Sequence, residues 1–303
     1  MSGGKVLVAG ATGSLGTQVC EALAAAGRDV RALVRPSADA SKLARLRALG
    51  AELVVGDLEQ PATLRPAVEG VSVVVTTASA FPGDPRPDAI ERVDRDGSIA
   101  LVDAAAAAGV ERFVYTSFRP IAREYPFQDA KQAVEARLRA SGLEYTILQP
   151  GSFMEVWFSP RLGFDVAGGS VVVYGDGTHP LTWISERDVT SFAAWAIDAA
   201  AARDASLVLG GPAALSQLDV VAIFERLAGK TLTVTHVPLA ELERRYAEAT
   251  TPVERSLGAV LLEVALGCVT DMTGLVAASG VRLTSVEQLA TLAHGHGGSS
   301  ITG

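Results

Sequence analysis

A glycine-rich turn between an apolar strand and an amphipathic helix limits what this chain of 303 residues can fold into. The apolar run 5–9 predicts a strand, the turn spans Gly10–Gly16, and a helix is expected over 14–26. In this setting Gly10 permits a sharp turn, Gly13 lets the backbone approach a pyrophosphate, and Gly16 lets the helix pack closely. The start of the helix offers unpaired N–H groups to an anion. The alternative interpretation is an ordinary turn between a strand and a helix.

Strand and helix signals alternate through the first half of the chain. This alternation predicts an α/β fold with a doubly wound parallel sheet, a Rossmann fold. Further strands are expected at 29–34, 52–55, 71–75, 110–116 and 145–148, and helices at 38–49, about 61–70, about 88–108 and 129–141. In the second half, strands are expected at 171–174, 206–209 and 232–237, with helices at 186–199, 215–227 and most of the remainder.

These signals predict a division into a cofactor domain and a substrate region. We expect an NADP-binding Rossmann domain over residues 1–150. A smaller, mostly helical substrate-binding region is expected over 151–293, interleaved with the Rossmann core. The tail 294–303 lacks apolar periodicity, so we expect it to be disordered.

Composition argues against several classes of protein. The formal net charge of −8 does not suit a nucleic-acid binder or a polybasic membrane anchor. No uncharged apolar run reaches the length of about 18 residues that a membrane span needs. Cys20 and Cys268 lack the spacing of a zinc site or a disulfide framework, and His294 and His296 are weak ligands, so no metal is expected. The N-terminus carries no secretory signal pattern, and we expect a cytoplasmic protein.

The end of the second strand distinguishes between two cofactors. An Asp or Glu about 20 residues beyond the glycine turn would bind the ribose hydroxyl of NAD, whereas an Arg accommodates the 2′-phosphate of NADP. Here Arg35 ends the strand and no carboxylate does. A guanidinium binds phosphate through two parallel hydrogen bonds. NADP(H) is therefore the expected cofactor, with Lys42 as a weaker second phosphate contact. Alternatively, Arg35 is a solvated loop residue.

Several motifs together resemble those of the NmrA-like group of atypical short-chain dehydrogenase/reductases. This group includes isoflavone-reductase-like enzymes and a type of NADPH-dependent quinone oxidoreductase. The resemblance reaches about residue 290, and besides the glycine turn it is carried by Leu33-Val34-Arg35, Gly56-Asp57-Leu58, the run Gln149–Met154 and Gly175-Asp176-Gly177. It implies adenine contacts from Asp57 and Leu58, although Asp57 can also be read as a turn or cap residue. It also implies that 76–79 passes beneath the ribose and nicotinamide, and that Pro150, Gly151 and Phe153 line the nicotinamide pocket.

The catalytic position departs from this resemblance. Classical members of the wider superfamily carry Tyr-x-x-x-Lys on a helix; Lys131 matches the lysine, but Phe127 stands at the tyrosine position and Tyr125 lies two residues earlier. Lys131 shares a helical face with Val134 and Leu138, which suggests a buried partner such as the ribose hydroxyls of the cofactor. The resemblance to isoflavone-reductase-like enzymes implies ribose anchoring and acid–base work for this lysine. The alternative is a surface lysine whose stem lies along apolar groups.

The candidate site residues follow from these arguments. Ser117 lies near the serine position of the superfamily, although a local hydrogen bond at the strand end is the alternative. Aromatic residues follow strands four to six, where they suit an apolar or aromatic substrate, unless they only pack the core. The catalytic candidates are Lys131 and Ser117; the cofactor candidates are Gly10, Thr12, Gly13, Ser14, Leu15, Gly16, Arg35, Lys42, Asp57, Leu58, Thr76, Thr77, Ala78, Lys131, Pro150, Gly151 and Phe153; the substrate candidates are Phe81, Phe118, Phe153, Trp157 and Phe158.

The function expected from this pattern is an NADPH-dependent reductase. It would transfer a hydride to a small apolar or aromatic acceptor, such as a quinone or a conjugated carbonyl. A quinone suits the missing tyrosine, because its reduced oxygen is a stable anion that needs less acid assistance. One alternative is a non-catalytic, NADP(H)-binding, redox-sensing regulator; another, less favoured, is an epimerase or dehydratase. The expected partner is a small-molecule substrate, with no nucleic acid or membrane, and a homodimer is considered as well.

Overall fold

The computed structural model describes residues 4–295, and they fall into two compact units. Within that range, the first unit contains 4–120, 125–149 and 189–207. The second unit contains 121–124, 150–188 and 208–295. The chain therefore returns to the first unit after it has entered the second.

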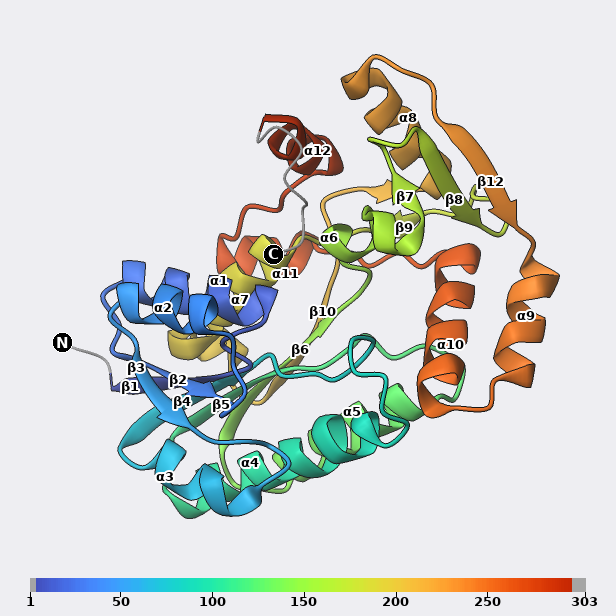
Figure 1. The fold of residues 1–303 in the computed structure, drawn as a ribbon. Coiled ribbons are helices and arrows are strands. Elements are labelled where there is room, and N and C mark those ends of the chain that lie inside the picture. The colour runs from blue at the N-terminus through green and yellow to red at the C-terminus, as the bar shows by residue number, and fades with distance from the viewer. Residues whose placement is uncertain (1–3, 296–303) are drawn as a thin grey trace. The chain divides into compact units, whose positions relative to one another are not determined.

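A seven-stranded sheet forms the middle layer of the first unit (Figure 1). The strand order is β10-β6-β5-β4-β1-β2-β3, and the neighbouring strands from β3 to β6 all pair in parallel. The order 3-2-1-4-5-6 is that of dinucleotide-binding sheets, so the predicted α/β fold is confirmed. The strands are β1 (Lys5–Ala9), β2 (Val30–Val34), β3 (Glu52–Val55), β4 (Val71–Thr76), β5 (Arg112–Thr116), β6 (Glu144–Pro150) and β10 (Ala205–Leu209).

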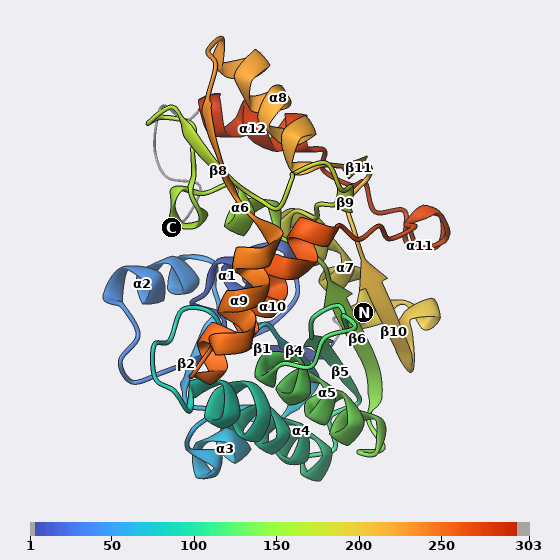
Figure 2. The ribbon, with the colours of Figure 1, turned by 90° about the vertical axis from the view of Figure 1, so that its right-hand side faces the viewer.

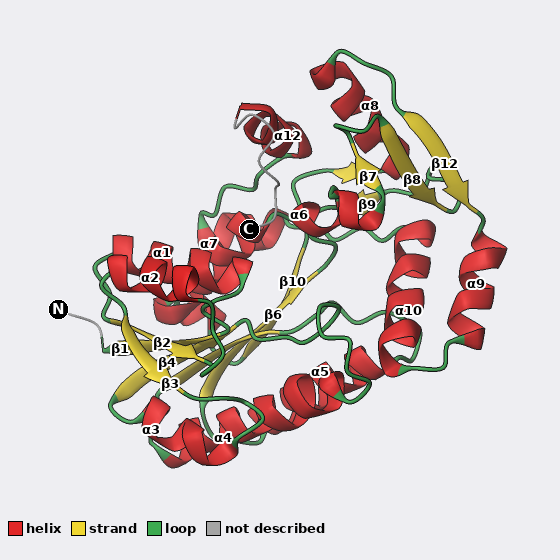
Figure 3. Ribbon diagram, viewed as in Figure 1, coloured by secondary structure: helices red, strands yellow, loops and turns green. Residues whose placement is uncertain are grey.

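Helices cover both faces of this sheet, as Figure 3 shows. On one face lie α1 (Ser14–Ala25), α2 (Ala40–Ala48) and α7 (Glu186–Asp198). On the other lie α3 (Leu64–Val68), α4 (Ser98–Ala107) and α5 (Pro126–Arg139). Short helical segments η1 (Pro61–Thr63), η2 (Ile90–Gly97) and η4 (Ala200–Ala202) complete the connections. Because both faces are covered, the central strands β1 and β4 consist largely of apolar residues.

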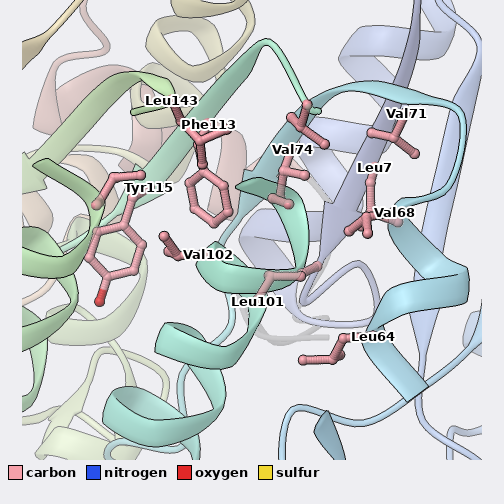
Figure 4. Packing of buried hydrophobic residues seen from close by; sticks show 14 of the residues in the cluster. Leu7, Leu64, Val68, Val71, Val74, Leu101, Val102, Phe113, Tyr115 and Leu143 are labelled. Atoms are coloured by element: carbon pink, nitrogen blue, oxygen red, sulfur yellow. The ribbon is translucent and has the colours of Figure 1, made fainter. Parts of the chain in front are cut away.

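The core of the first unit lies between the sheet and the α3–α4–α5 layer. Leu101 and Val102 of α4 pack beside Phe113 of β5 and Val74 of β4 (Figure 4). All four side chains are fully buried, and β4 is a mostly apolar strand. This packing fixes the strand ends from which the candidate site is built.

Two predicted helices differ from the observed elements. The helix expected over 88–108 is a π-helical segment, η2, followed by α4. The helix expected over 129–141 begins earlier, at Pro126, because proline is favoured at the first helical position, where its missing N–H costs no hydrogen bond. Phe127 therefore lies in the first turn of α5.

The second unit contains a three-stranded sheet of order β12-β8-β7 and a two-stranded sheet of β11 and β9. Helices α9 and α10 lie side by side (Figure 2). The strands are β7 (Phe164–Asp165), β8 (Ser170–Tyr174), β9 (Leu181–Thr182), β11 (Ala214–Leu215) and β12 (Thr233–Val237). The helices are α6 (Met154–Trp157), η3 (Pro160–Leu162), α8 (Gln217–Ala228), α9 (Leu239–Glu248), α10 (Pro252–Leu266), α11 (Thr273–Ser279) and α12 (Val286–Gly295).

The end of the chain differs in part from the expected tail. Helix α12 continues to Gly295, so the positions 294 and 295 are helical. The rest of the tail, His296 included, lies outside the described residues. Within residues 4–295, no helix combines the length and hydropathy of a membrane span.

Candidate cofactor-binding site

The glycine turn closes tightly at the end of β1. Gly10 adopts a φ of +81°, and the Gly13 N–H donates to the Gly10 carbonyl over 2.9 Å. A Cβ on Gly10 would lie 2.7 Å from the Ala78 nitrogen, and one on Gly16 would lie 2.1 Å from the Gly10 oxygen. Neither position has room for a side chain. The turn thus brings the start of α1 against β1 and the segment that follows β4.

A cavity of about 560 Å³ opens beside this turn. Its walls come from the segments that follow β1, β2, β3 and β4, and from η2 and α2, all in the first unit. Ligands of open α/β sheets bind at these carboxyl ends of the strands. The lining residues are Gly10, Thr12, Gly13, Leu33, Arg35, Lys42, Gly56, Asp57, Leu58, Glu59, Thr77, Ala78, Ser79, Ala80, Gly83, Asp84, Pro85 and Val93.

Nine predicted cofactor residues therefore line one cavity: Gly10, Thr12, Gly13, Arg35, Lys42, Asp57, Leu58, Thr77 and Ala78. Four other candidates are not among its lining residues. Ser14, Leu15 and Gly16 form the first turn of α1, the end of a helix at which backbone N–H groups point toward a ligand. Thr76 is buried at the end of β4, where its hydroxyl accepts a long, 3.4 Å hydrogen bond from the Ala78 N–H.

Two cations line the cavity. Arg35 and Lys42 are both exposed, and within residues 4–295 neither forms an ion pair. Lys42 is held near the start of α2, where the Asp39 side chain accepts from the backbone N–H groups of Ser41 and Lys42. Because neither cation is held in an ion pair, both can attract an anionic ligand.

Asp57 is a turn residue that also lines the cavity, and its contact with an adenine stays a prediction. Its Oδ1 atom accepts from the Glu59 N–H over 3.0 Å, which is the pattern of a turn residue. Its backbone N–H donates to the Thr63 hydroxyl, which fixes the start of the connection after β3. The residue lines the cavity at the same time. The turn therefore orients the carboxylate and does not remove it from the site.

Lys131 is buried and forms an ion pair that the sequence did not indicate. Its side chain is 3% exposed, and Nζ lies 3.3 Å from Oδ1 of Asp94, which is fully buried. The ammonium also lies over the rings of Tyr115 and Phe127, with distances of 5.3 and 5.1 Å to their centroids. The Ala80 N–H donates to Oδ2 of Asp94 over 3.1 Å. Asp94 thus links Lys131 to a wall of the cavity, and the surface alternative for Lys131 is wrong.

Ser117 bonds to a buried carboxylate. Its hydroxyl donates to Oε1 of Glu135 over 2.6 Å, and the Gln149 side-chain amide donates to the same atom over 2.9 Å. Arg139 binds the other oxygen of Glu135 over 2.9 Å. The Ser117 proton is therefore engaged within a network of β5, α5 and β6, which favours a positioning role over direct chemistry.

The predicted aromatic substrate residues fall into two sets. In the first unit, Phe81 and Phe118 both contact the Phe127 ring, with centroid distances of 4.6 and 5.8 Å. In the second unit, Trp157 and Phe158 are buried and pack with Trp183, so they take part in a core. Their contact with a substrate stays a prediction.

The predicted nicotinamide-pocket residues belong to the second unit. Pro150 ends β6, and the Gly151 N–H donates to the Leu209 carbonyl over 3.0 Å. Phe153 forms a parallel bridge with Ile184 before α6. Their assignment to a nicotinamide pocket stays a prediction.

Four charged residues of the first unit were missed by the sequence analysis: Glu59, Asp84, Arg86 and Asp94. Arg86 binds both Glu59 and Asp84, and these hydrogen bonds hold the pKa of each carboxyl below its usual range. The sequence shows a charged run at Asp84–Asp88, but nothing in that run indicates that Arg86 pairs with Glu59, which follows β3.

The strand order and the glycine turn define a dinucleotide-binding α/β protein. A model of the NmrA-like family matches residues 2–263, and the chain belongs to this family. The resemblance inferred from the motifs is therefore confirmed.

Similar proteins carry different names. The chain is 31% identical over 240 residues to the photosystem II assembly factor Ycf39 of Cyanophora paradoxa, covering 78% of this chain and 73% of the relative. It is 30% identical over 241 residues to the NAD(P)H azoreductase of Xenophilus azovorans, covering 79% of each. The fold matches that of the NADPH-dependent quinone oxidoreductase QOR2 of Escherichia coli complexed with NADPH, with a TM-score of 0.73, 22% identity, and coverage of 95% of this chain and 99% of that one.

Proposed function

We propose that this chain is an NADP(H)-dependent reductase that transfers a hydride to a small apolar or aromatic acceptor, such as a quinone or a conjugated carbonyl. One observation carries the proposal. A glycine turn, a helix N-terminus and the unpaired cations Arg35 and Lys42 meet at one cavity. One relative is named as an azoreductase, and a solved structure of similar fold is named as a quinone oxidoreductase, which supports the same class of reaction.

The cavity residues fit this cofactor group by group. The amides at the start of α1 suit the pyrophosphate, and Arg35 with Lys42 suits the 2′-phosphate. Asp57 and Leu58 would meet the adenine, and Thr77 would lie near the ribose. The nicotinamide would supply the hydride when bound. The chain's own contribution is to bind, orient and surround the reacting groups.

The residues around Phe127 indicate the chemical class of the acceptor. A phenylalanine has no proton to donate, and the Lys131 ammonium beside it is held by Asp94. An acceptor that leaves a stable anion after reduction needs least acid assistance, and quinones meet this condition. Phe81 and Phe118 are only partly buried, so their ring faces can contact a flat acceptor.

A second candidate is an NADP(H)-binding protein that reports redox state to a protein partner without turnover. The same two observations favour it, because neither Phe127 nor a paired, buried Lys131 supplies an obvious acid. The relative from Cyanophora paradoxa is named as an assembly factor and not as a reductase, which supports this candidate.

Two measurements on the purified full chain separate these candidates. Calorimetry gives the Kd for NADPH and NADH, and nicotinamide absorbance gives turnover with a panel of quinones, an azo dye and a conjugated ketone. A reductase should bind NADPH more tightly than NADH and oxidise it in the presence of a quinone. Tight binding without turnover of any acceptor contradicts the reductase and favours the regulator. Absence of binding to either dinucleotide contradicts both.

A further inference from the structure

Arg86 neutralises two carboxylates in the wall of the cavity. Its guanidinium donates to both oxygens of Glu59, over 3.0 and 2.6 Å. It also donates to both oxygens of Asp84, with a shortest distance of 2.7 Å. Arg92 adds a second contact to Glu59, with its guanidinium nitrogen 2.8 Å from Oε2. The loop after β4 is thereby held against the segment after β3.

These two carboxylates share the cavity with two cations. Glu59 and Asp84 line the same cavity as Arg35 and Lys42, and both carboxylate side chains are more than three-quarters buried. Arg35 lies near enough to Asp84 to contribute to its lowered pKa, although the hydrogen bonds from Arg86 are the larger cause. Both carboxylates are therefore ionised near neutral pH, and their negative charge acts on whatever binds beside Arg35.

A 2′-phosphate brings up to two negative charges into this space, whereas the ribose hydroxyl of NAD brings none. Without Arg86, Glu59 would keep only Arg92, and Asp84 would keep no ion pair among the described residues. The carboxylate charge left unmatched would repel the phosphate and draw Arg35 toward itself. With Arg86 in place, the carboxylate charge is matched locally by a bidentate partner. Arg35 and Lys42 then remain available for the ligand.

We infer that Arg86 determines the preference for the phosphorylated dinucleotide, by neutralising Glu59 and Asp84 without contacting the phosphate itself. This inference rests on the proposed function, because it needs a dinucleotide in the cavity. It assigns a role in cofactor specificity to Arg86, which belongs neither to the glycine turn nor to the two cations Arg35 and Lys42. Arg86 is a positioning residue in this account.

The test compares the Kd for NADPH and NADH in the full chain and in Arg86→Met. At low ionic strength, the Kd for NADPH should rise about three- to tenfold while the Kd for NADH changes less than about twofold. The difference should shrink at physiological salt, because screening weakens charge interactions across a cavity. The matched control is Arg95→Met: Arg95 has similar exposure and pairs with Glu91 and Asp96, and neither of these carboxylates lines the cavity.

A rescue variant separates neutralisation from direct contact. Adding Glu59→Gln and Asp84→Asn to Arg86→Met removes the charges that Arg86 matches, so the NADPH preference should return. Failure of this rescue means that Arg86 contacts the phosphate directly and overturns the inference. Equal weakening of both dinucleotides by Arg86→Met also overturns it, since the loop would then only shape the cavity. If the wild-type chain binds neither dinucleotide, both the proposed function and the inference are wrong. If the wild type prefers NADPH and Arg86→Met keeps the same preference, only the inference is wrong.

Discussion

At the scale of single residues, the Lys131–Asp94 pair is the most demanding feature of the first unit. Both side chains lie within the buried interior, so each loses hydration on folding. What offsets this loss is their mutual attraction, the Ala80 N–H on Asp94 and the aromatic faces beneath Lys131. A buried pair of this kind specifies one arrangement of η2, α5 and the cavity wall more than it adds stability.

Removing both partners should therefore cost less than the sum of the costs of removing each one alone. We expect Asp94→Asn or Lys131→Met alone to lower the free energy of unfolding by about 3–5 kcal/mol, because each leaves an uncompensated buried charge. Urea denaturation gives these values. The double variant should lose clearly less than the sum of the single losses, which a double-mutant cycle measures. Additive losses would show that the two charges do not interact.

At the scale of elements, α10 depends on its N-terminal cap. The Thr251 side chain accepts from the Glu254 N–H, and the Glu254 carboxylate accepts in return from the Thr250 and Thr251 N–H groups. Pro252 occupies the first helical position. Such reciprocal caps satisfy the N–H groups that have no helical acceptor.

Loss of this cap should be measurable. We expect Thr251→Ala to destabilise the chain by about 1 kcal/mol, seen as a lower midpoint in urea. Thr231→Ala, at an exposed residue between α8 and β12, is the matched control and should leave the midpoint nearly unchanged. Equal midpoints for both variants would contradict the capping role.

The same cap gives a pH dependence with a definite sign. Hydrogen bonds, chiefly from Thr250, hold the pKa of Glu254 below its usual value of 4.5. A lowered folded-state pKa means that the contribution is present above about pH 4.5 and is lost as the pH falls through the lowered value. Glu254→Gln cannot titrate, so its urea midpoint should fall less steeply below pH 4.5 than that of the wild type. Parallel declines would contradict the assignment.

The elements also show what a sequence can and cannot predict. Strands β1 to β6 were expected within about two residues at each end, because apolar runs bounded by glycine mark buried strands well. The π-helical turns of η2 were not expected, since periodicity does not distinguish them from an α-helix. Nine cofactor candidates share the cavity because strand ends meet at one sheet edge. Lys131 pairs with Asp94, and Arg86 pairs with Glu59. In both pairs the partner comes from another segment of the chain, so no local sequence pattern indicates it.

At the scale of the whole molecule, the division into two units affects how ligand binding appears in a melting experiment. The described cavity belongs to the first unit. A ligand that binds only the folded state stabilises it by about 2.7 kcal/mol at a hundredfold excess over its Kd. If the units unfold separately, only the transition that includes the first unit gains this free energy. If they unfold together, the single transition shifts by a smaller amount.

Thermal unfolding with matched ligands therefore tests the cavity and its charges together. At equal concentrations, NADPH should raise the Tm of the affected transition by several degrees, roughly 5 °C at a hundredfold excess over Kd, and NADH should raise it less. In Arg35→Gln the shift with NADPH should fall to the level seen with NADH, because the guanidinium that meets the 2′-phosphate is gone while the glycine turn remains. The shift with NADH should stay as in the wild type. Equal wild-type shifts with both dinucleotides would refute the role given to Arg35 and Lys42, and no shift with either would refute the cavity as a dinucleotide site.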